Sequence, residues 1–566
     1  MNHTDNTSKF SYIDEVKNDL ASKTGVNLFA DKLSLSSIKF GMVLAALLVI
    51  FYNKSFFLAA AGTISSVSMM GVLFYISLIA VLWLLTLLSL NFILIPWLVK
   101  PLSILLLLAS SVAAYFMDTY GVVIDKEMLR NVLETDAKET HDLLSLKLIM
   151  YVSFIGVLPS ILVIKTRIVW KSFTQELIAR AVIIMVALLI SVVLILSFSS
   201  FYSSFFRNHK EVRFLTNPLG FIYGGVSLFK EMHKAPVAID PIGVGSKAGV
   251  GLTGQTKPVL FVYVIGETAR AENFGLSGYK RNTTPLLEKQ NVAYFNKFSS
   301  CGTSTAVSLP CMFSIMPRAE YSDAKAKSQH GLLDFLNEAG INVLWRNNNS
   351  GCKGVCDRVN YETFPIESFP DLCKNGSCVD EILLKNLDEK LTGKNQIIVL
   401  HQKGSHGPAY DQRYPDSMRF YTPVCKTNQL QNCTREEVVN TYDNTIRYTD
   451  YFLNELLVWI KTKNDAYNTV MIYVSDHGES LGENRLYLHG MPYAVAPKTQ
   501  TQVPFIFWAS DNFYNERGIV KDCLYELQST SYSHDNLFHS VLGLFDIKTD
   551  YYESKLDIFS PCTKRI

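Results

Sequence analysis

Five long apolar stretches before residue 205 constrain the fold of this chain more than any other feature. They cover residues 38–60, 69–95, 98–118, 146–165 and 178–200. Each is long enough to cross the ~30 Å hydrocarbon core of a bilayer as an α-helix. A helix in a globular core would be shorter and apolar on one face only. The sequence therefore predicts a five-helix transmembrane domain.

The charges between these stretches predict how the domain is oriented. The segment 165–180 carries four Lys and Arg residues and a single Glu, whereas the loop 125–142 is mostly acidic. Because basic loops stay in the cytoplasm, we expect the N-terminus in the cytoplasm and everything after residue 200 outside. Residues 1–37 lack the apolar core of a cleavable signal and are expected to form a cytoplasmic extension.

All ten cysteines lie in the second half of the chain, after residue 300. This distribution indicates an oxidising compartment, which agrees with the outside location of that half. Proximity suggests five disulfides, which would join Cys301 with Cys311, Cys352 with Cys356, Cys373 with Cys378, Cys425 with Cys433, and Cys523 with Cys562. The alternative is a structural zinc site formed by the four thiolates between residues 352 and 378.

Charge and composition organise the rest of the chain. A formal net charge of +2 over 566 residues gives no support for a nucleic-acid partner, and no protein partner is implied. Basic and aromatic residues alternate after residue 201, so this connector is expected to lie in the membrane interface or to be a solvated linker. A glycine-rich patch, Gly243–Gly254, ends the connector. The expected divisions are 1–37, 38–200, 201–256 and 257–566.

From Lys257 onward, apolar runs alternate with helical segments such as 332–339 and 442–461. The apolar runs cover residues 259–265, 341–345, 397–400, 469–474 and 503–508. Continuous apolar runs are typical of strands that are buried on both faces. The pattern predicts an α/β domain with a mostly parallel, doubly wound sheet.

Acidic and imidazole side chains follow three of these runs. Glu267 follows the first run, His401 and His406 follow the third, and Asp476 with His477 follows the fourth. Because the carboxyl ends of parallel strands meet at one edge of a sheet, we expect these side chains to converge there. Glu267, Asp476 and His477 are a ligand set that a zinc-like ion accepts, with a fourth position left open.

A hydroxyl-rich run, Ser299–Cys311, offers groups for that fourth position. It leads into a possible helix whose N-terminal amides would favour a phosphate. A Thr hydroxyl is a weak nucleophile near neutral pH, and coordination to zinc would lower its pKa. Taken one at a time, each hydroxyl in the run is better explained by ordinary helix capping.

Several segments closely resemble the lipid A phosphoethanolamine transferases, the family that includes the mobile colistin-resistance enzymes. They are Gly266–Asn273, Ser300–Ser314, His401–His406, Ser475–Asn484 and Leu488–Gly490. The resemblance spans about residues 38–562. It implies the alkaline phosphatase and sulfatase fold for the C-terminal domain. It also implies a multi-pass protein of the inner membrane of a Gram-negative bacterium, with this domain in the periplasm.

The same resemblance implies roles for individual residues. The expected zinc ligands are Glu267, Thr305, Asp476 and His477. Thr305 is also the expected nucleophile, and His406 and His489 match catalytic residues around the transferred group or a second zinc ion. The expected substrate-binding residues are Asn349, Lys353, His401, His406, Glu479 and His489.

The implied reaction moves phosphoethanolamine from phosphatidylethanolamine to a lipid A phosphate through a covalent Thr intermediate, which should confer polymyxin resistance. It requires one zinc ion, and a second ion during turnover is left open. The alternatives are a phosphoethanolamine or phosphoglycerol transferase for another envelope glycan, and a phosphodiesterase of the same superfamily. A sulfatase is disfavoured because Ser308-Leu309-Pro310 continues without the arginine of the sulfatase pattern. A non-catalytic membrane sensor is disfavoured because the expected nucleophile and ligands are all present.

Overall fold

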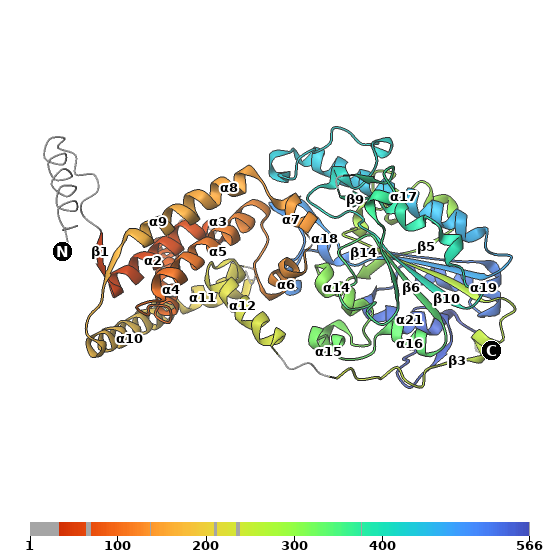
Figure 1. Cartoon of the computed structure of the whole chain (residues 1–566), viewed down its shortest axis with the longest axis horizontal. Coiled ribbons are helices and arrows are strands. Elements are labelled where there is room, and N and C mark those ends of the chain that lie inside the picture. Colours follow the sequence, from red (N-terminus) through yellow and green to blue (C-terminus); the bar gives the residue numbers. More distant parts are fainter. Residues whose placement is uncertain are drawn as a thin grey trace, which may run out of the picture. The chain divides into compact units, whose positions relative to one another are not determined.

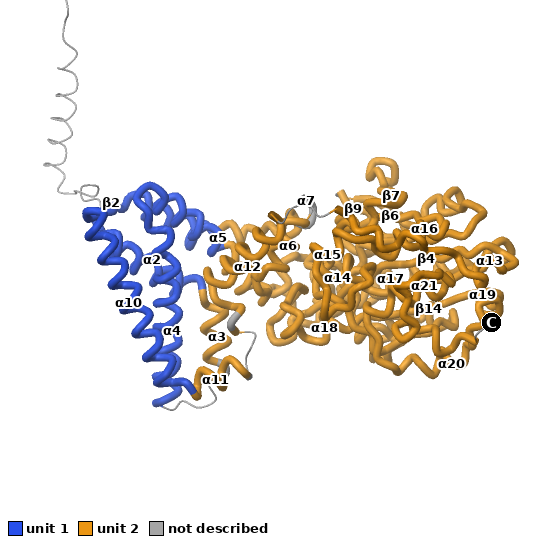
Figure 2. Tube along the Cα trace, turned by 90° about the horizontal axis from the view of Figure 1, so that it is seen from below, with its two compact units in different colours: residues 1–52, 68–111, 151–199 blue, residues 53–67, 112–150, 200–566 orange. Residues whose placement is uncertain are grey.

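The computed structural model describes residues 33–63, 69–135, 137–208, 212–233, 238–374 and 376–564. The chain forms two compact units, which Figure 2 shows in different colours. Unit 1 comprises residues 1–52, 68–111 and 151–199, and unit 2 comprises 53–67, 112–150 and 200–566. Residues 1–32 of the predicted cytoplasmic extension, 1–37, lie outside the described residues.

The apolar stretches of the sequence form long helices. Within the described ranges, four helical segments are long and apolar enough to span a membrane: α4 (Met69–Leu90), α5 (Val99–Tyr120), the continuous segment Leu146–Lys165, and α10 (Phe173–Ser197). A bent pair, α2 (Ser37–Tyr52) and α3 (Lys54–Thr63), makes a fifth if it crosses as one span. Leu189 of α10 is 65% exposed, as expected of a helix that faces lipid. The predicted multi-pass helical region is therefore confirmed, with four or five candidate spans.

Unit 2 contains an eight-stranded sheet (Figure 1). In spatial order its strands are β15 (Tyr532–Ser533), β5 (Ala293–Ser299), β14 (Gln502–Ala509), β11 (Asn468–Ser475), β4 (Val259–Gly266), β10 (Gln396–His401), β6 (Asn342–Asn347) and β7 (Asn360–Glu362). In this sheet β14 is antiparallel to both of its neighbours, and the other pairs are parallel. The predicted mostly parallel sheet is confirmed.

Two features of the sheet go beyond the prediction. The run at 503–508 forms β14, which pairs directly with β11 in the antiparallel direction. The segment between them holds a hairpin, β12 (Ser480–Glu483) with β13 (Leu486–Leu488), and no helix long enough for a parallel crossover. Strand β5 was not predicted, because its polar residues Asn296 and Lys297 interrupt the apolar run.

Helices cover both faces of the sheet (Figure 1). One face packs against α14 (Thr305–Met312), α16 (Leu332–Glu338) and α21 (Leu537–Leu544), and the other against α17 (Arg435–Lys461). The neighbours Phe261 and Val262 of β4 are fully buried in these two different cores. Because both faces are covered, polar side chains can gather only beyond the strand ends.

All ten cysteines are joined in five disulfides. The pairs are Cys301–Cys311, Cys352–Cys356, Cys373–Cys378, Cys425–Cys433 and Cys523–Cys562. The four cysteines between residues 352 and 378 are therefore paired as disulfides and do not form a zinc cluster.

Candidate active site

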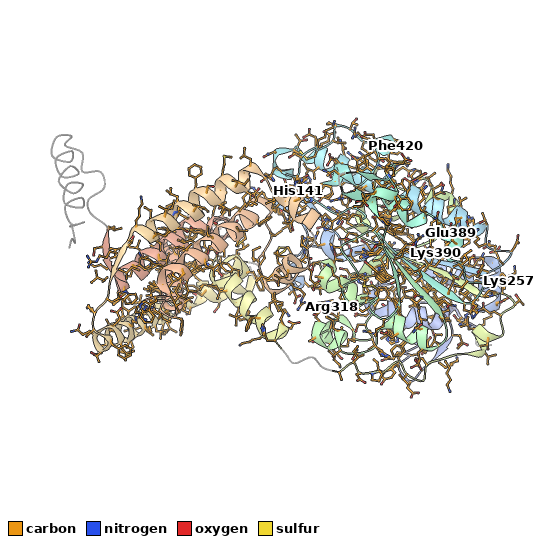
Figure 3. The ribbon with its side chains drawn as sticks, viewed as in Figure 1. His141, Lys257, Arg318, Glu389, Lys390 and Phe420 are labelled. Carbon is orange, nitrogen blue, oxygen red and sulfur yellow. A yellow bond between two sulfur atoms is a disulfide. The ribbon has the colours of Figure 1, made fainter. Side chains whose placement is uncertain are left out.

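Three predicted ligands meet where two central strands end. Strands β4 and β11 pair in parallel register with Gly266 opposite Ser475, so the next residues, Glu267 and Asp476, lie side by side. Together with His477 they are fully buried. Surface side chains such as Lys257 and Phe420, by contrast, lie at the periphery of unit 2 (Figure 3). The strand register, rather than any local motif, brings the ligands together.

Thr305 completes this cluster from a helix end. It is the first residue of α14, and its hydroxyl donates to the two carboxylate oxygens of Glu267 at 3.1 and 3.0 Å. The same oxygen lies 3.3 Å from Nε2 of His477. The first amide groups of a helix have no partner within the helix, and they favour an anion placed beside them. The hydroxyl of Thr305 therefore lies where a phosphoryl group would be stabilised.

Backbone geometry allows the surrounding loops to approach Glu267 closely. Gly404 has φ +54°, and a Cβ at this position would lie 2.6 Å from the carbonyl oxygen of Glu267. Only glycine fits there. Ser405 donates its amide hydrogen to that same carbonyl at 3.0 Å. Thr268, with φ +53°, is also left-handed, a costly conformation for a β-branched residue and one typical of functional sites.

The donor set fits a divalent metal ion. One ligand atom from each of Glu267, Asp476 and His477 lies within 4.8 Å of the others. Oδ2 of Asp476 is buried and has no hydrogen-bond partner. Nδ1 of His477 lies 2.9 Å from the carbonyl oxygen of Gly478, which can hold the Nδ1 hydrogen, so Nε2 is the nitrogen that would bind a metal ion once it has lost its own hydrogen. Two carboxylates, one imidazole and the Thr305 hydroxyl make a four-ligand set of the kind zinc accepts.

The electrostatics of the cluster favour a cation. Burial raises the pKa of Glu267, but His477 outweighs burial and leaves that pKa well below its usual range. Burial and the charge of Glu267 raise the pKa of Asp476 to about 7. Burial lowers the pKa of His477, but the two carboxylates outweigh it and raise this pKa to about 10. Two buried carboxylates thus compete for one proton-bearing imidazole, and a divalent cation would satisfy both.

Asn349 and His401 form the next layer around Glu267. Asn349 donates from Nδ2 to Oε2 of Glu267 at 2.7 Å. Nε2 of His401 lies 3.3 Å from the same Asn349 nitrogen, and its Nδ1 lies 2.9 Å from Oδ1 of Asn347. Burial lowers the pKa of His401 to about 4, so this ring is neutral. His401 therefore orients Asn349.

Two further predicted residues, Glu479 and His489, form a pair beside His477. Nδ1 of His489 lies 2.8 Å from Oε2 of Glu479, and the ring centroids of His489 and His477 are 4.4 Å apart. Tyr410 donates its hydroxyl hydrogen to the other oxygen of Glu479 at 2.5 Å. No sequence motif marks Tyr410. The Glu479 carboxylate fixes Nδ1 of His489 as the protonated nitrogen, which leaves the lone pair on Nε2.

His406 is held through its backbone. Its ring centroid is 5.5 Å from that of His489. The buried Arg413 donates from Nε to the carbonyl oxygen of His406 at 2.7 Å, and from Nη2 to Asp142 at 3.2 Å. Asp142 lies on α7 (Ala137–Leu143), which belongs to the same unit. Arg413, like Tyr410, carried no signal in the sequence.

Lys353 stands apart from the other predicted residues. Its ammonium donates to the carbonyl oxygen of Glu134 on α6 (Lys126–Glu134) at 3.0 Å, and Lys353 itself has φ +52°. A cavity of about 530 Å³ opens here between Glu134, Lys353, Arg358 and the C-terminal half of α14. The structure thus places Lys353 beside this cavity, whereas Glu267, Thr305, Asn349, His401, His406, Asp476, His477, Glu479 and His489 form one connected cluster.

A site of this kind, at the carboxyl edge of such a sheet, is typical of enzymes that act on phosphoryl or sulfuryl groups. The sulfatase family model matches residues 260–547, and the model described as phosphoethanolamine transferase EptA/EptB matches residues 80–232. Together the two models cover the apolar helices from residue 80 onward and most of the α/β domain.

Similarity to individual proteins shows the family to which the chain belongs. The chain is 41% identical over 474 residues to phosphoethanolamine transferase EptA of Escherichia coli K12, covering 83% of this chain and 86% of that protein. It is 41% identical over 467 residues to phosphatidylethanolamine transferase Mcr-1 of Escherichia coli, covering 80% and 85%. The solved structure of EptA from Neisseria meningitidis matches 94% of this chain and all of that chain, with a TM-score of 0.90 and 36% identity. The chain belongs to the phosphoethanolamine transferase family.

Proposed function

We propose that this protein transfers phosphoethanolamine from phosphatidylethanolamine to a phosphate group of lipid A, with Thr305 as the covalent carrier. One observation carries the proposal. The Thr305 hydroxyl lies within 3.3 Å of both Glu267 and His477, at the start of a helix and inside a set of metal ligands. The named relatives support the substrates, since one is called a phosphatidylethanolamine transferase and another a Kdo(2)-lipid A phosphoethanolamine transferase.

The first step transfers the group to the enzyme. The Thr305 oxygen forms a bond to phosphorus, and the bond between phosphorus and the diacylglycerol oxygen breaks. The Thr305 hydroxyl gives its proton to Nε2 of His489, whose Nδ1 hydrogen is held by Glu479, and the diacylglycerol oxygen leaves with the electron pair and takes that proton from Nε2. The proton that Thr305 loses balances the one that diacylglycerol gains.

The second step releases the group to the acceptor. A lipid A phosphate oxygen attacks the phosphorus, the bond to Thr305 breaks, and the proton of the acceptor phosphate returns to Thr305. Glu267, Asp476, His477 and Thr305 would hold the zinc ion. Zinc supplies positive charge that lowers the pKa of the Thr305 hydroxyl and stabilises the phosphoryl charge. His406 is placed to contact the transferred phosphate, while Asn349 keeps Glu267 oriented.

Both substrates are lipids, which accounts for the apolar helices. We infer that the protein is a five-span inner-membrane protein with a cytoplasmic N-terminus and a periplasmic C-terminal domain. The added ammonium group offsets lipid A phosphate charge, so expression should raise resistance to cationic peptides such as polymyxin.

Reporter fusions test the orientation of the protein in the membrane. A periplasm-dependent reporter fused after residue 200 should be active, and the same reporter placed in the basic loop 165–180 should be inactive.

The chemistry is tested by mass spectrometry of the protein purified from membranes containing phosphatidylethanolamine. The peptide that holds Thr305 should carry phosphoethanolamine, and Thr305→Ala should carry none and should lose lipid A modification. Thr303→Ala is the matched control, because its hydroxyl lies in the same loop and donates to the carbonyl oxygen of Met491 at 2.7 Å. An active enzyme that never carries the adduct would remove Thr305 from this role. Release of free phosphoethanolamine without modified lipid A would instead identify a phosphodiesterase.

A further inference from the structure

A further buried histidine, His534, lies behind the site, in a segment that no motif singled out. His534 begins a short turn, His534–Asn536, directly after β15, the strand that pairs in parallel with β5. Its side chain is 1% exposed, and it packs 5.9 Å from the ring of Phe298, centroid to centroid. It is far from the ligands in sequence, but it lies beneath the loop that carries the nucleophile.

Both ring nitrogens of His534 bind backbone groups. Cys301 donates its amide hydrogen to Nδ1 at 3.0 Å, and Nε2 lies 3.0 Å from the carbonyl oxygen of Ser475. A backbone amide can only donate and a backbone carbonyl can only accept, so the ring must be neutral with its hydrogen on Nε2. Burial lowers the pKa of His534 to about 3, in agreement with this tautomer.

These two backbone groups belong to the two halves of the site. Cys301 opens the loop that leads to Thr305, and Ser475 immediately precedes Asp476. One imidazole therefore joins the loop of the nucleophile to the end of the strand that carries two metal ligands. A donor in one segment and an acceptor in the other fix the spacing between them to about the width of one ring.

Ser308 makes a second link in the same place. It lies on α14, one turn after Thr305, and it donates its hydroxyl hydrogen to the carbonyl oxygen of Asp476. Its oxygen is 3.3 Å from Nδ1 of His534 and accepts from the amide of Gly302 at 3.4 Å. The α14 helix and the end of β11 are thus connected by two side chains that do not touch the ligand atoms themselves.

We propose that His534, with Ser308, is a positioning residue that holds the nucleophile Thr305 at a fixed distance from Asp476 and His477. The proposal rests on the proposed function for the identity of the nucleophile. In this arrangement His534 neither contacts substrate nor exchanges a proton. It sets the distance across which Thr305 faces the metal ligands, and a shift of about 1 Å there costs on the order of 100-fold in rate.

The test compares His534→Phe with His539→Phe in the full-length protein. His539 is equally buried on α21, and its Nδ1 accepts from the amide of Glu553 at 3.1 Å, so it is a histidine of the same core without a link to the site. We expect His534→Phe to lower kcat for lipid A modification about 100-fold with KM changed less than about threefold, and His539→Phe to leave kcat within about threefold at a similar loss of melting temperature.

Two smaller substitutions keep the test decisive if the phenylalanine variant folds poorly. His534→Asn retains an acceptor for the Cys301 amide and should recover part of the lost kcat. Ser308→Ala removes only a hydroxyl and should lower kcat with little change in melting temperature. Equal kcat values for His534→Phe and His539→Phe at matched melting temperatures, or no recovery in His534→Asn, would overturn the proposal.

A second readout separates this inference from the proposed function. Zinc retention against a competing chelator reports the ligand geometry whatever reaction the protein performs, and His534→Phe should lose zinc at a lower chelator concentration than His539→Phe. If wild type forms no Thr305 adduct, the proposed function fails, and zinc retention still decides the role of His534. If the adduct forms equally fast in His534→Phe and zinc retention is unchanged, the positioning role fails alone.

Discussion

At the scale of single residues, hydrogen bonds behind the site decide which atoms can act. The Glu479 carboxylate accepts from Tyr410 on one oxygen and pairs with His489 on the other. A carboxylate so placed fixes the tautomer and the orientation of the imidazole. The orientation of His489 therefore depends on Glu479 and, through it, on Tyr410.

Glu479→Gln removes the charge that supports His489 while keeping a hydrogen-bonding side chain. We expect kcat for lipid A modification to fall about 10- to 100-fold, because the imidazole loses its anionic partner. Tyr410→Phe should have a smaller effect in the same direction. The measurement is steady-state transfer to lipid A by the purified protein.

A second Tyr–Glu pair provides the control. Tyr448 donates to Glu381 at 3.0 Å within the same unit, and neither residue contacts the ligand cluster. Tyr448→Phe should leave kcat within about twofold, since it removes a hydrogen bond to a carboxylate that contributes about 2 kcal/mol to stability but lies outside the ligand cluster. An equal loss of activity in Tyr448→Phe and Tyr410→Phe would mean that the latter acts through stability alone.

At the scale of elements, α17 supports one whole face of the sheet and begins with a complete capping box. Thr434 accepts from the amide of Glu437 at 3.2 Å, and the Glu437 carboxylate accepts from the amide of Thr434 at 2.7 Å. The helix then buries Leu453 and Leu456 against the core that includes alternate residues of β4. Two otherwise unpaired amides at its start are satisfied by this exchange.

Thr434→Ala should destabilise the protein by about 1 kcal/mol, since the amide of Glu437 loses its partner. For a unit of this size that corresponds to a melting temperature lower by about 2 °C. Thr462→Ala, at the other end of α17, is the control: its hydroxyl only donates to the Trp459 carbonyl at 2.7 Å, so we expect a smaller shift. Thermal unfolding of both variants in detergent measures the difference.

At the scale of the whole molecule, the buried charges of the site favour a bound metal ion in the folded state. Glu267 and Asp476 are both fully buried and adjacent. Bringing two carboxylates together out of water is costly unless a cation offsets them. The metal is therefore expected to stabilise the C-terminal unit as well as to enable the reaction.

Chelation should abolish transfer and lower the melting temperature. A metal at 100 times its dissociation constant contributes about 2.7 kcal/mol of stability to the folded state. Zinc should restore both properties and magnesium should not, because magnesium prefers an octahedral shell of oxygen ligands and water. Unchanged melting of the chelated protein, with metal loss verified by elemental analysis, would contradict this expectation.

The sequence by itself determined the apolar spans, the alternation of strands and helices, and three of the site residues. Each of these follows from a local sequence pattern: a long apolar run, a short apolar run typical of a buried strand, or Glu267, Asp476 and His477 directly after such a run. Assigning Thr305 within its hydroxyl-rich run needed family resemblance, since a serine or threonine at a helix start has an ordinary capping role.

Only the tertiary structure decided the direction of β14 and the supporting roles of Tyr410, Arg413 and His534. The groups that they bind in Glu479, His406 and Cys301 are 69, 7 and 233 positions away in sequence. The sequence around a tyrosine, an arginine or a histidine in a loop does not indicate which group that side chain will bind. Its role arises when strand register and helix packing bring a specific donor or acceptor within 3 Å, and that distance is a property of the folded chain.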